Sequence, residues 1–305
     1  GTACSGVCAG IANNGIGVTG IAGGCSVMPL KVADSAGEMS FTSIENALTH
    51  AADHNVDVIS MSLGAESGTA EGSSPSTDTA FTYAYNAGVV IFAATANSDA
   101  STIAYPANHT VVISVGAASP TGQRKSASSS DGEYWWGSNY GTAVQDAKEA
   151  VDIMAPTILP ATDLVSGGYS TTNYYMWFNG TSCATPYAAG VAALLLSKDP
   201  SLTPAQVRTA MTSTATDMTS DGGAGWDRYT GYGMVNANNA LNSLIPGMPS
   251  CQITSPTGGS VFDLNSTISV AVTATDTDGT ITGVAFYIDS ASTPSYTDTS
   301  SPYTW

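Results

Sequence analysis

Two polar residues in this chain of 305 residues have the side chains and the surroundings that acyl transfer requires. Ser182 lies in "NGTSCATP", directly before a run that is apolar on every side, so it should occupy the first turn of a buried helix. Free N–H groups at a helix N-terminus can stabilise the anion that forms when a serine attacks a carbonyl carbon. Asn97 follows the apolar run "VVIFAAT" and offers an amide donor at the expected end of a strand. The pair predicts a nucleophile and an oxyanion donor.

Both residues also have a common structural interpretation. A serine in the first turn of a helix is often a cap, and an asparagine in a loop is often a turn residue. The local motif is G-T-S-C-A rather than G-x-S-x-G, so the nucleophile turn of the α/β-hydrolases does not fit. The local pattern therefore leaves the cap and the nucleophile open as alternatives.

The elements that must position these residues alternate along the first 244 positions. Continuous apolar runs such as 89–95 and 111–117 are typical of parallel strands that are buried on both faces. We expect strands at 27–32, 56–64, 89–95 and 111–117, and helices at 41–54, 79–88 and 202–215. The last helix should begin with Thr203 as its N-cap and Pro204 at its first position. This alternation predicts an α/β fold in which helices cover a mainly parallel sheet.

The charge balance limits the possible partners. Lys and Arg number 7 against 24 Asp and Glu, which gives a formal net charge of −17. This balance argues against nucleic-acid binding, which needs a basic surface. No apolar run approaches the ~20 residues of a membrane span. We expect an extracellular monomer whose charge keeps its copies apart.

The chain has five cysteines, and none forms a C-x-x-C pair, which argues against a zinc site. In an exported protein Cys25 is expected to form a disulfide with either Cys4 or Cys8. The alternative is that these residues are buried free thiols. Five is an odd number, and we expect Cys183, beside Ser182, to be a buried free thiol.

The composition changes near residue 244. Residues 245–249 are rich in Pro and Gly and predict a linker between a first domain, 1–244, and a second, 250–305. The second region alternates apolar and polar residues with a period of two and contains turn signals, including "DTDG" at 276–279. This pattern predicts an antiparallel β-sandwich. The region is too short for a complete sandwich of about 100 residues, so we expect only part of one.

The ordered motifs of residues 1–244 resemble those of the subtilisin-like serine proteases, the subtilases. "GTACSGVCAGIANNGIGVTGIA" resembles the helix and loop that follow the catalytic histidine of this family. "DVISMSLG" resembles its substrate-binding strand, "GVVIFAATANS" its oxyanion-asparagine segment and "GTSCATPYAAGVAALLL" its serine helix. The resemblance implies a three-layer, subtilisin-like fold with a mainly parallel sheet. Residues 250–305 resemble bacterial Ig-like modules, which implies a partial all-β sandwich at the C-terminus.

The resemblance implies a role for each matched position. Ser182 would be the nucleophile, and Asn97 would bind the oxyanion together with the backbone N–H of Ser182. Six other positions match substrate-binding residues, namely Ser62, Leu63 and Gly64, whose backbone would pair with an extended substrate, and Ala94, Thr95 and Ala96, which would line the primary specificity pocket. The family often has Gly where this chain has Ala96, so the added methyl group leaves specificity open.

The rest of the catalytic triad is the main departure from the family. Subtilases have the order Asp, His, Ser, and their His-Gly-Thr motif aligns with Gly1 and Thr2 here, so we expect the histidine before Gly1 and the aspartate further upstream. His50, His54 and His109 match no triad position; the first two are expected on a helix face and His109 in a surface turn. Without its base a serine is a poor nucleophile, so the chain as given is expected to be inactive or nearly so.

The loop 12–18 resembles the loop that holds a structural calcium ion in many subtilases. Asn14 would give a side-chain oxygen, and Ala12, Ile16 and Val18 would give carbonyl oxygens. Calcium takes six to eight oxygen ligands, so others must come from elsewhere. The alternative is a glycine-bearing turn. No catalytic cofactor is expected.

Trp135 and Trp136 lie in a polar, glycine-rich stretch, where they would either border a cleft or pack a loop onto the core. From the residues and the resemblance together, we expect a secreted bacterial serine endopeptidase that hydrolyses polypeptides through an acyl-enzyme on Ser182. The alternative is a non-catalytic protein of subtilase fold that binds peptides.

Overall fold

The structure is a computed structural model that describes residues 1–65, 74–244, 249–258, 260–276, 280–288 and 293–305. These residues form two compact units, Gly1–Ala240 and Leu241–Trp305. The predicted linker at 245–249 and the "DTDG" turn lie almost entirely outside the described residues. Within the described ranges, no helix combines the length and the apolar character needed to cross a membrane.

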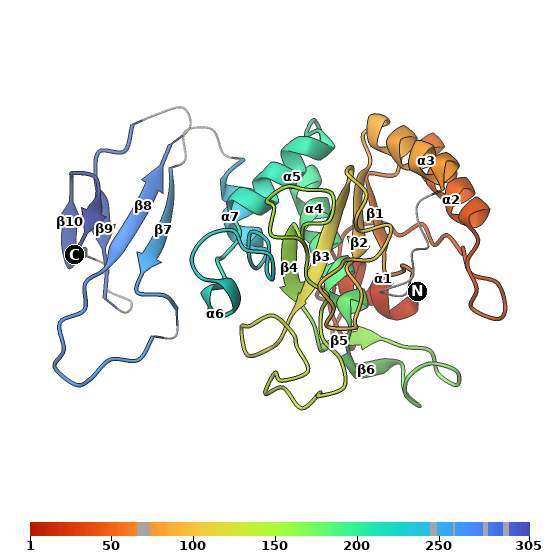
Figure 1. The fold of residues 1–305 in the computed structure, drawn as a ribbon, viewed down its shortest axis with the longest axis horizontal. Coiled ribbons are helices and arrows are strands. Elements are labelled where there is room, and N and C mark those ends of the chain that lie inside the picture. Colours follow the sequence, from red (N-terminus) through yellow and green to blue (C-terminus); the bar gives the residue numbers. More distant parts are fainter. Residues whose placement is uncertain (66–73, 245–248, 259, 277–279, 289–292) are drawn as a thin grey trace. The chain divides into compact units, whose positions relative to one another are not determined.

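Four parallel strands form the main sheet of the first unit (Figure 1). In spatial order they are β1 (Val58–Met61), β2 (Val90–Ala94), β3 (Val112–Ala118) and β4 (Ile153–Pro156). The register places Val58 opposite Val90, Ile91 opposite Val112 and Val115 opposite Ile153. Every residue of β2 and β3 is buried, which explains why their sequences are continuous apolar runs. The predicted parallel sheet is confirmed.

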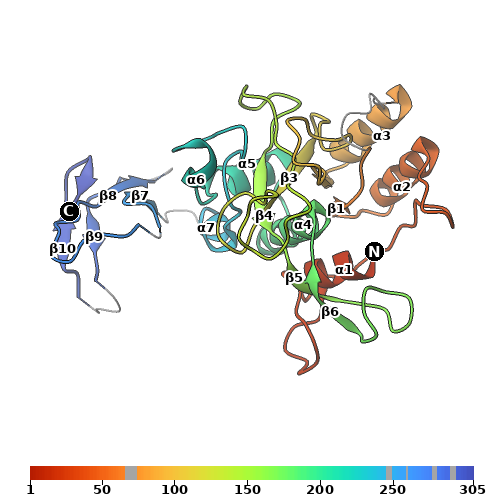
Figure 2. The same cartoon turned by 60° about the horizontal axis from the view of Figure 1, so that its bottom comes forward.

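Helices cover both faces of this sheet. On one face, α2 (Phe41–Asp53) and α3 (Pro75–Asn86) pack against each other and share an apolar cluster with alternate residues of β2. On the other, α4 (Thr181–Lys198) contacts all four strands and is buried along most of its length, as its sequence predicts. Two more helices are α5 (Pro204–Ser213), which contacts α4, and α1 (Thr2–Ala9), which packs against α4 and β5, close to the strand pair in Figure 2. The result is the expected three-layer α/β fold.

The cap of α5 also agrees with its sequence. Thr203 accepts a hydrogen bond from the backbone N–H of Gln206, the Gln206 side chain bonds back to the Thr203 backbone, and Pro204 opens the helix. The first unit also contains the short helix α6 (Thr219–Gly222), the antiparallel pair β5 (Leu159–Thr162) and β6 (Tyr174–Phe178), and the first four residues of α7 (Ala237–Asn242).

The strand expected at 27–32 does not form. In this stretch of the chain the nearest pairing is an isolated bridge between Ala33 and Met39. Val27, Met28 and Leu30 are 48%, 42% and 37% exposed. A strand needs a hydrogen-bonding partner, and the described residues present none to this segment. The apolar pattern alone was therefore an insufficient guide.

The strands that the structure describes in the second unit pair antiparallel. They are β7 (Ser250–Ser255), β8 (Ala271–Thr275), β9 (Val284–Phe286), β10 (Tyr296–Asp298) and β11 (Tyr303–Thr304). One sheet has the order β11-β8-β7, and a second pairs β10 with β9. Val272, Val284, Phe286 and Tyr303 form a small buried cluster. This arrangement confirms the predicted all-β character of the region.

Candidate active site

Ser182 occupies the second position of α4 and does not cap the helix. The N-cap is Gly180, which has no side chain to offer a hydrogen bond and has a φ of 84°. Ser182 is half-buried, and among the described residues no group forms a hydrogen bond with its Oγ or with its backbone N–H. Its hydroxyl and its N–H are therefore both available to a ligand, which excludes the cap interpretation.

Asn97 lies beside the start of this helix. Its Oδ1 accepts hydrogen bonds from the backbone N–H of Thr181 at 2.8 Å and from the Thr181 hydroxyl at 2.9 Å. These two bonds fix the amide plane. Asn97 is exposed, and its Nδ2 donates to no acceptor in the described part of the chain. The structure thus brings together two predicted site residues, Asn97 and Ser182, from distant positions in the sequence.

Gly180 shows how the two donors converge. A Cβ atom added to Gly180 would lie 3.3 Å from Asn97 Nδ2 and 3.5 Å from the backbone nitrogen of Ser182. Both donors therefore border the same small space, which stays open because residue 180 has no side chain. Hydrogen-bond donors placed around one point are the arrangement that stabilises an oxyanion.

The carbonyl oxygen of Ser182 is held from outside the helix. Pro186 lies four residues further along α4 and has no N–H to donate to this carbonyl. Ser62 Oγ, just after β1, donates to it at 2.8 Å, and Cys4 Sγ on α1 donates at 3.6 Å. Three separate elements therefore meet at the backbone of Ser182.

The predicted substrate-binding residues follow two neighbouring strands. Ser62 and Leu63 are half-buried and Gly64 is exposed, and the N–H of the next residue, Ala65, donates to the Tyr105 carbonyl at 3.0 Å. Of the other three predicted residues, Ala94 is the last residue of β2, and Thr95 and Ala96 join the strand to Asn97.

Ala96 has an unusual backbone conformation for a residue with a side chain. Its φ is 87°, in the region that favours glycine, and its carbonyl accepts a hydrogen bond from Asn139 N–H at 3.0 Å. The chain therefore adopts a strained conformation directly before Asn97. Such strain often accompanies functional sites because the surrounding contacts must hold it.

No histidine of the described chain reaches Ser182. His50 and His54 are exposed at the end of α2, with ring centroids 3.9 Å apart. The expected surface position of His109 is wrong. This residue is only 8% exposed, and its Nε2 lies 3.7 Å from Asp78 Oδ1. Burial lowers the pKa of His109, while the charge of Asp78 acts in the opposite direction.

The predicted calcium loop is an exposed series of bends. Asn14 Oδ1 accepts a hydrogen bond from the N–H of Ile16 at 2.9 Å. Asn13, Gly15 and Gly17 all have positive φ. The predicted set of Ala12, Asn14, Ile16 and Val18 offers four oxygens, of the chemistry that calcium prefers but fewer than it needs. No acidic, cysteine or histidine cluster suited to a metal occurs in the described residues.

All five cysteines are unpaired in the structure. Cys183 is fully buried, as expected, and burial raises its pKa to about 12. Burial also raises the pKa of Cys8 to about 11, and the charges of Cys25 and then Cys4 add to this effect. Cys25 is exposed.

A loop that the sequence analysis did not assign to the site supports the residue before Gly180. Glu133 Oε1 accepts a hydrogen bond from Asn179 Nδ2 at 2.8 Å, and its Oε2 accepts one from Trp136 Nε1 at 2.5 Å.

Lys125 is fully buried and donates to three carbonyl oxygens, those of Ser126, Glu133 and Trp136. Trp136 packs into the loop, whereas Trp135 is 71% exposed. The only sequence signal was a lysine in a chain with few cations.

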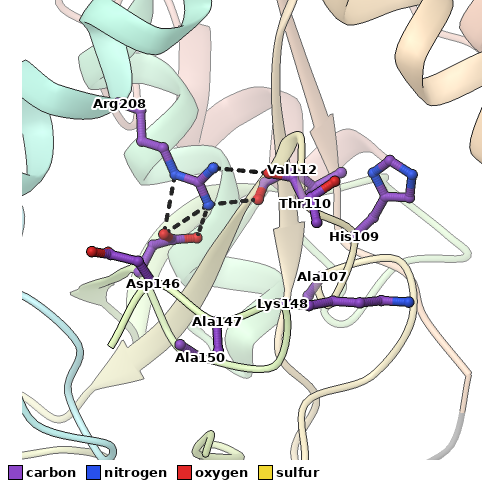
Figure 3. A pocket seen from close by; sticks show the side chains of 10 residues that line it. Ala107, His109, Thr110, Val112, Asp146, Ala147, Lys148, Ala150 and Arg208 are labelled. Atoms are coloured by element: carbon purple, nitrogen blue, oxygen red, sulfur yellow. Dashed lines mark hydrogen bonds and ion pairs between the residues drawn. The ribbon is translucent and has the colours of Figure 1, made fainter. Parts of the chain in front are cut away.

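A pocket of about 210 Å³ lies at the other end of the sheet (Figure 3). It is lined by residues that precede β3 and β4 and by Arg208 of α5. The Arg208 guanidinium bonds to both carboxylate oxygens of Asp152 at 2.7 Å and to the carbonyls of Thr110 and Val112. Asn97 follows the carboxyl end of β2, so this pocket is separate from the candidate active site.

Comparisons with known proteins agree with this geometry. The model of the subtilase family matches residues 1–233, and the model of the bacterial Ig domain matches residues 249–305. Subtilisin E of Bacillus subtilis (strain 168) is 37% identical over 232 residues, which are 75% of this chain and 52% of that protein. Thermitase of Thermoactinomyces vulgaris is 34% identical over 243 residues, 79% of this chain and 74% of thermitase.

Solved structures give the same result. Sphericase has a TM-score of 0.64 at 27% identity, covering 77% of this chain and 76% of its own. The prenylagaramide maturation protease PagA has a TM-score of 0.62 at 26% identity, covering 80% and 82%. The chain spans about half the length of several curated relatives, including subtilisin E. With a family match over residues 1–233 and the shared three-layer fold, the chain belongs to the subtilase family.

Proposed function

We propose that the first unit belongs to a serine endopeptidase that cleaves polypeptides through an acyl-enzyme on Ser182. The observation that carries this proposal is the convergence of Asn97 Nδ2 and Ser182 N–H on the space beside Gly180. Ser182 Oγ would bond to the peptide carbonyl carbon while these two donors stabilise the oxyanion. The hydroxyl proton passes to a base and then to the leaving amine, and water later hydrolyses the ester.

The base in this proposal is a histidine outside the described residues. None of the three histidines contacts Ser182 in the part of the chain that the structure describes. His50 and His54 stack on each other, and His109 lies beside Asp78. The substrate would lie along the backbone of Ser62, Leu63 and Gly64, with its specificity side chain against Ala94, Thr95 and Ala96. We further propose an extracellular bacterial monomer, which its net charge of −17 suits.

An active-site label tests the proposal directly. The protein is expressed from its complete gene, treated with a fluorophosphonate and digested, and the labelled residue is identified by mass spectrometry. We expect label on Ser182, none in a Ser182→Ala variant, and little in the isolated 305-residue chain. A folded, fully processed protein without label on Ser182 contradicts the proposal.

A second candidate is a non-catalytic peptide-binding protein, in which the same backbone of Ser62, Leu63 and Gly64 would pair with an extended peptide. The same experiment separates the two functions. A binding protein would retain peptides in a calorimetric titration but would carry no label on Ser182.

We propose that calcium binds the loop 12–18 through Asn14 Oδ1 and the carbonyls of Ala12, Ile16 and Val18, with further oxygens from elsewhere. The ion would hold an exposed loop whose backbone has three positive φ values. A rise in melting temperature on adding calcium, reduced in Asn14→Ala, tests this idea. Equal melting temperatures with calcium and with a chelator would exclude it.

We also propose a disulfide between Cys8 and Cys25 rather than between Cys4 and Cys25. The Ala22 N–H donates to the Cys8 carbonyl, and the Cys25 N–H donates to the Ala22 carbonyl, so a short turn joins the two positions. Cys4 is already directed at Ser182. The two thiols would lose two protons and two electrons to an external disulfide by exchange. Non-reducing peptide mapping of the secreted protein should find this linkage, and a free Cys8 contradicts it.

A further inference from the structure

The carbonyl of Ser182 is the one backbone group of the nucleophile that an uninterrupted helix would have satisfied. Pro186 removes that donor, because proline has no N–H. One residue earlier the carbonyl has a donor within the helix, since Thr185 Oγ1 donates to the Thr181 carbonyl at 2.8 Å from within α4. Leaving a partly buried carbonyl without a partner costs free energy, so its replacement donors matter.

Two side chains from other elements supply those donors. The hydroxyl of Ser62 is the stronger, at 2.8 Å, and the thiol of Cys4 is a weak donor at 3.6 Å. Asn97 holds the residue before Ser182, because its Oδ1 accepts a hydrogen bond from the N–H of Thr181 at 2.8 Å. The backbone around Ser182 is therefore held on its N-terminal side by Asn97 and on its C-terminal side by Ser62.

We propose that Ser62 is a positioning residue, whose hydroxyl fixes the Ser182 carbonyl and thereby aligns the nucleophile with the strand on which the substrate lies. The proposal rests on the proposed function, in which the backbone of residues 62–64 pairs with the substrate. The Ser62 backbone would contact the substrate while its side chain holds Ser182. Ser62 would then fix the nucleophile relative to the scissile bond, and a near-attack geometry requires such alignment.

The test compares Ser62→Ala with Ser60→Ala in the protein expressed from its complete gene. Ser60 is an exposed residue of β1, two positions before Ser62, which makes it a matched control. The measurements are kcat and KM for an extended peptide, the rate of fluorophosphonate labelling at Ser182, and the melting temperature. Ser62→Thr, which keeps a hydroxyl, is the conservative variant.

We expect Ser62→Ala to lower kcat and the labelling rate by about three- to tenfold, the range for one lost hydrogen bond. KM should change less than about twofold, because the backbone that binds substrate is intact. Ser62→Thr should recover most of the rate, and Ser60→Ala should match the wild type. A change confined to KM or to the melting temperature overturns the proposal, as does an unchanged labelling rate. A wild type without label on Ser182 instead refutes the proposed function.

Discussion

The polar groups at one end of the parallel sheet are hydrogen-bonded to one another, whereas several of those at the other end have no partner among the described residues. At the amino ends of β3 and β4, the carboxylate of Asp152 accepts hydrogen bonds from Ser114 and Arg208, and Arg208 also reaches two backbone carbonyls. At the carboxyl end of β2, Asn97 Nδ2 and the hydroxyl and N–H of Ser182 have no partner among the described residues. Asn97 is exposed and Ser182 is half-buried, so these groups are open to solvent and can bind a ligand, whereas the buried polar groups at the other end are already paired.

The largest expected effect comes from removing a donor at the unpaired end. Asn97→Ala should lower kcat by about 100- to 1,000-fold, a range that was itself measured for a subtilisin asparagine rather than derived for this chain. KM should change little, because the lost interaction forms mainly in the transition state. Steady-state kinetics on the protein from the complete gene measures this. A kcat within threefold of the wild type would mean that Nδ2 does not face the oxyanion.

The next effect should appear at the paired end, and in stability rather than in rate. Arg208→Met leaves the Asp152 carboxylate, whose side chain is 10% exposed, without its cation. We expect a loss of about 2–3 kcal/mol in the free energy of unfolding, below the range for fully buried pairs because Arg208 is a third exposed. Urea denaturation measures the loss, and kcat should stay within twofold. A large fall in kcat without loss of stability would contradict this prediction, because Arg208 would then act on the reaction rather than on the fold.

These contrasts also show which features a sequence can predict. The strands β2 and β3 were predictable because strands buried on both faces are apolar at every position, and α5 was predictable from Thr203 and Pro204. The stretch 27–32 has a similar local pattern but no pairing partner in the described chain, and partners cannot be read from a local pattern.

Some features of the candidate site could likewise be predicted from the local sequence, and others could not. Ser182 and Asn97 were predictable because a helix start and a strand end are local features. Pro186 indicated a free carbonyl, but only the fold reveals that Ser62, 120 residues away, supplies its donor. The bond between Glu133 and Asn179 was missed for the same reason.

A smaller effect should follow from relaxing the strain before Asn97. Ala96→Gly removes a side chain from a residue with φ 87°. We expect a gain of about 0.5–1 kcal/mol in the free energy of unfolding, since the steric cost of this conformation exceeds the added backbone entropy of glycine. The kcat should fall by a few-fold, because Asn97 would be held less firmly. Thermal denaturation and kinetics on the same samples test both parts, and a loss of stability would show that Ala96 is not strained.

The smallest effect should be a pH dependence of stability that comes from His109, near the end of the sheet where the polar groups are paired. Burial lowers the pKa of His109 below its usual value of about 6.5, so the unfolded chain takes up a proton at a higher pH than the folded one. The stability from neutral His109 is therefore fully present above about pH 6.5 and is lost as the pH falls through the lower, folded pKa. The groups facing its ring are Asp78, which opposes the shift, Phe81, and the more distant Lys148, which adds to it. Urea midpoints measured from pH 7.5 to pH 5 should fall less in His109→Gln than in the wild type. Equal slopes would mean that the Asp78 charge cancels the effect of burial on His109.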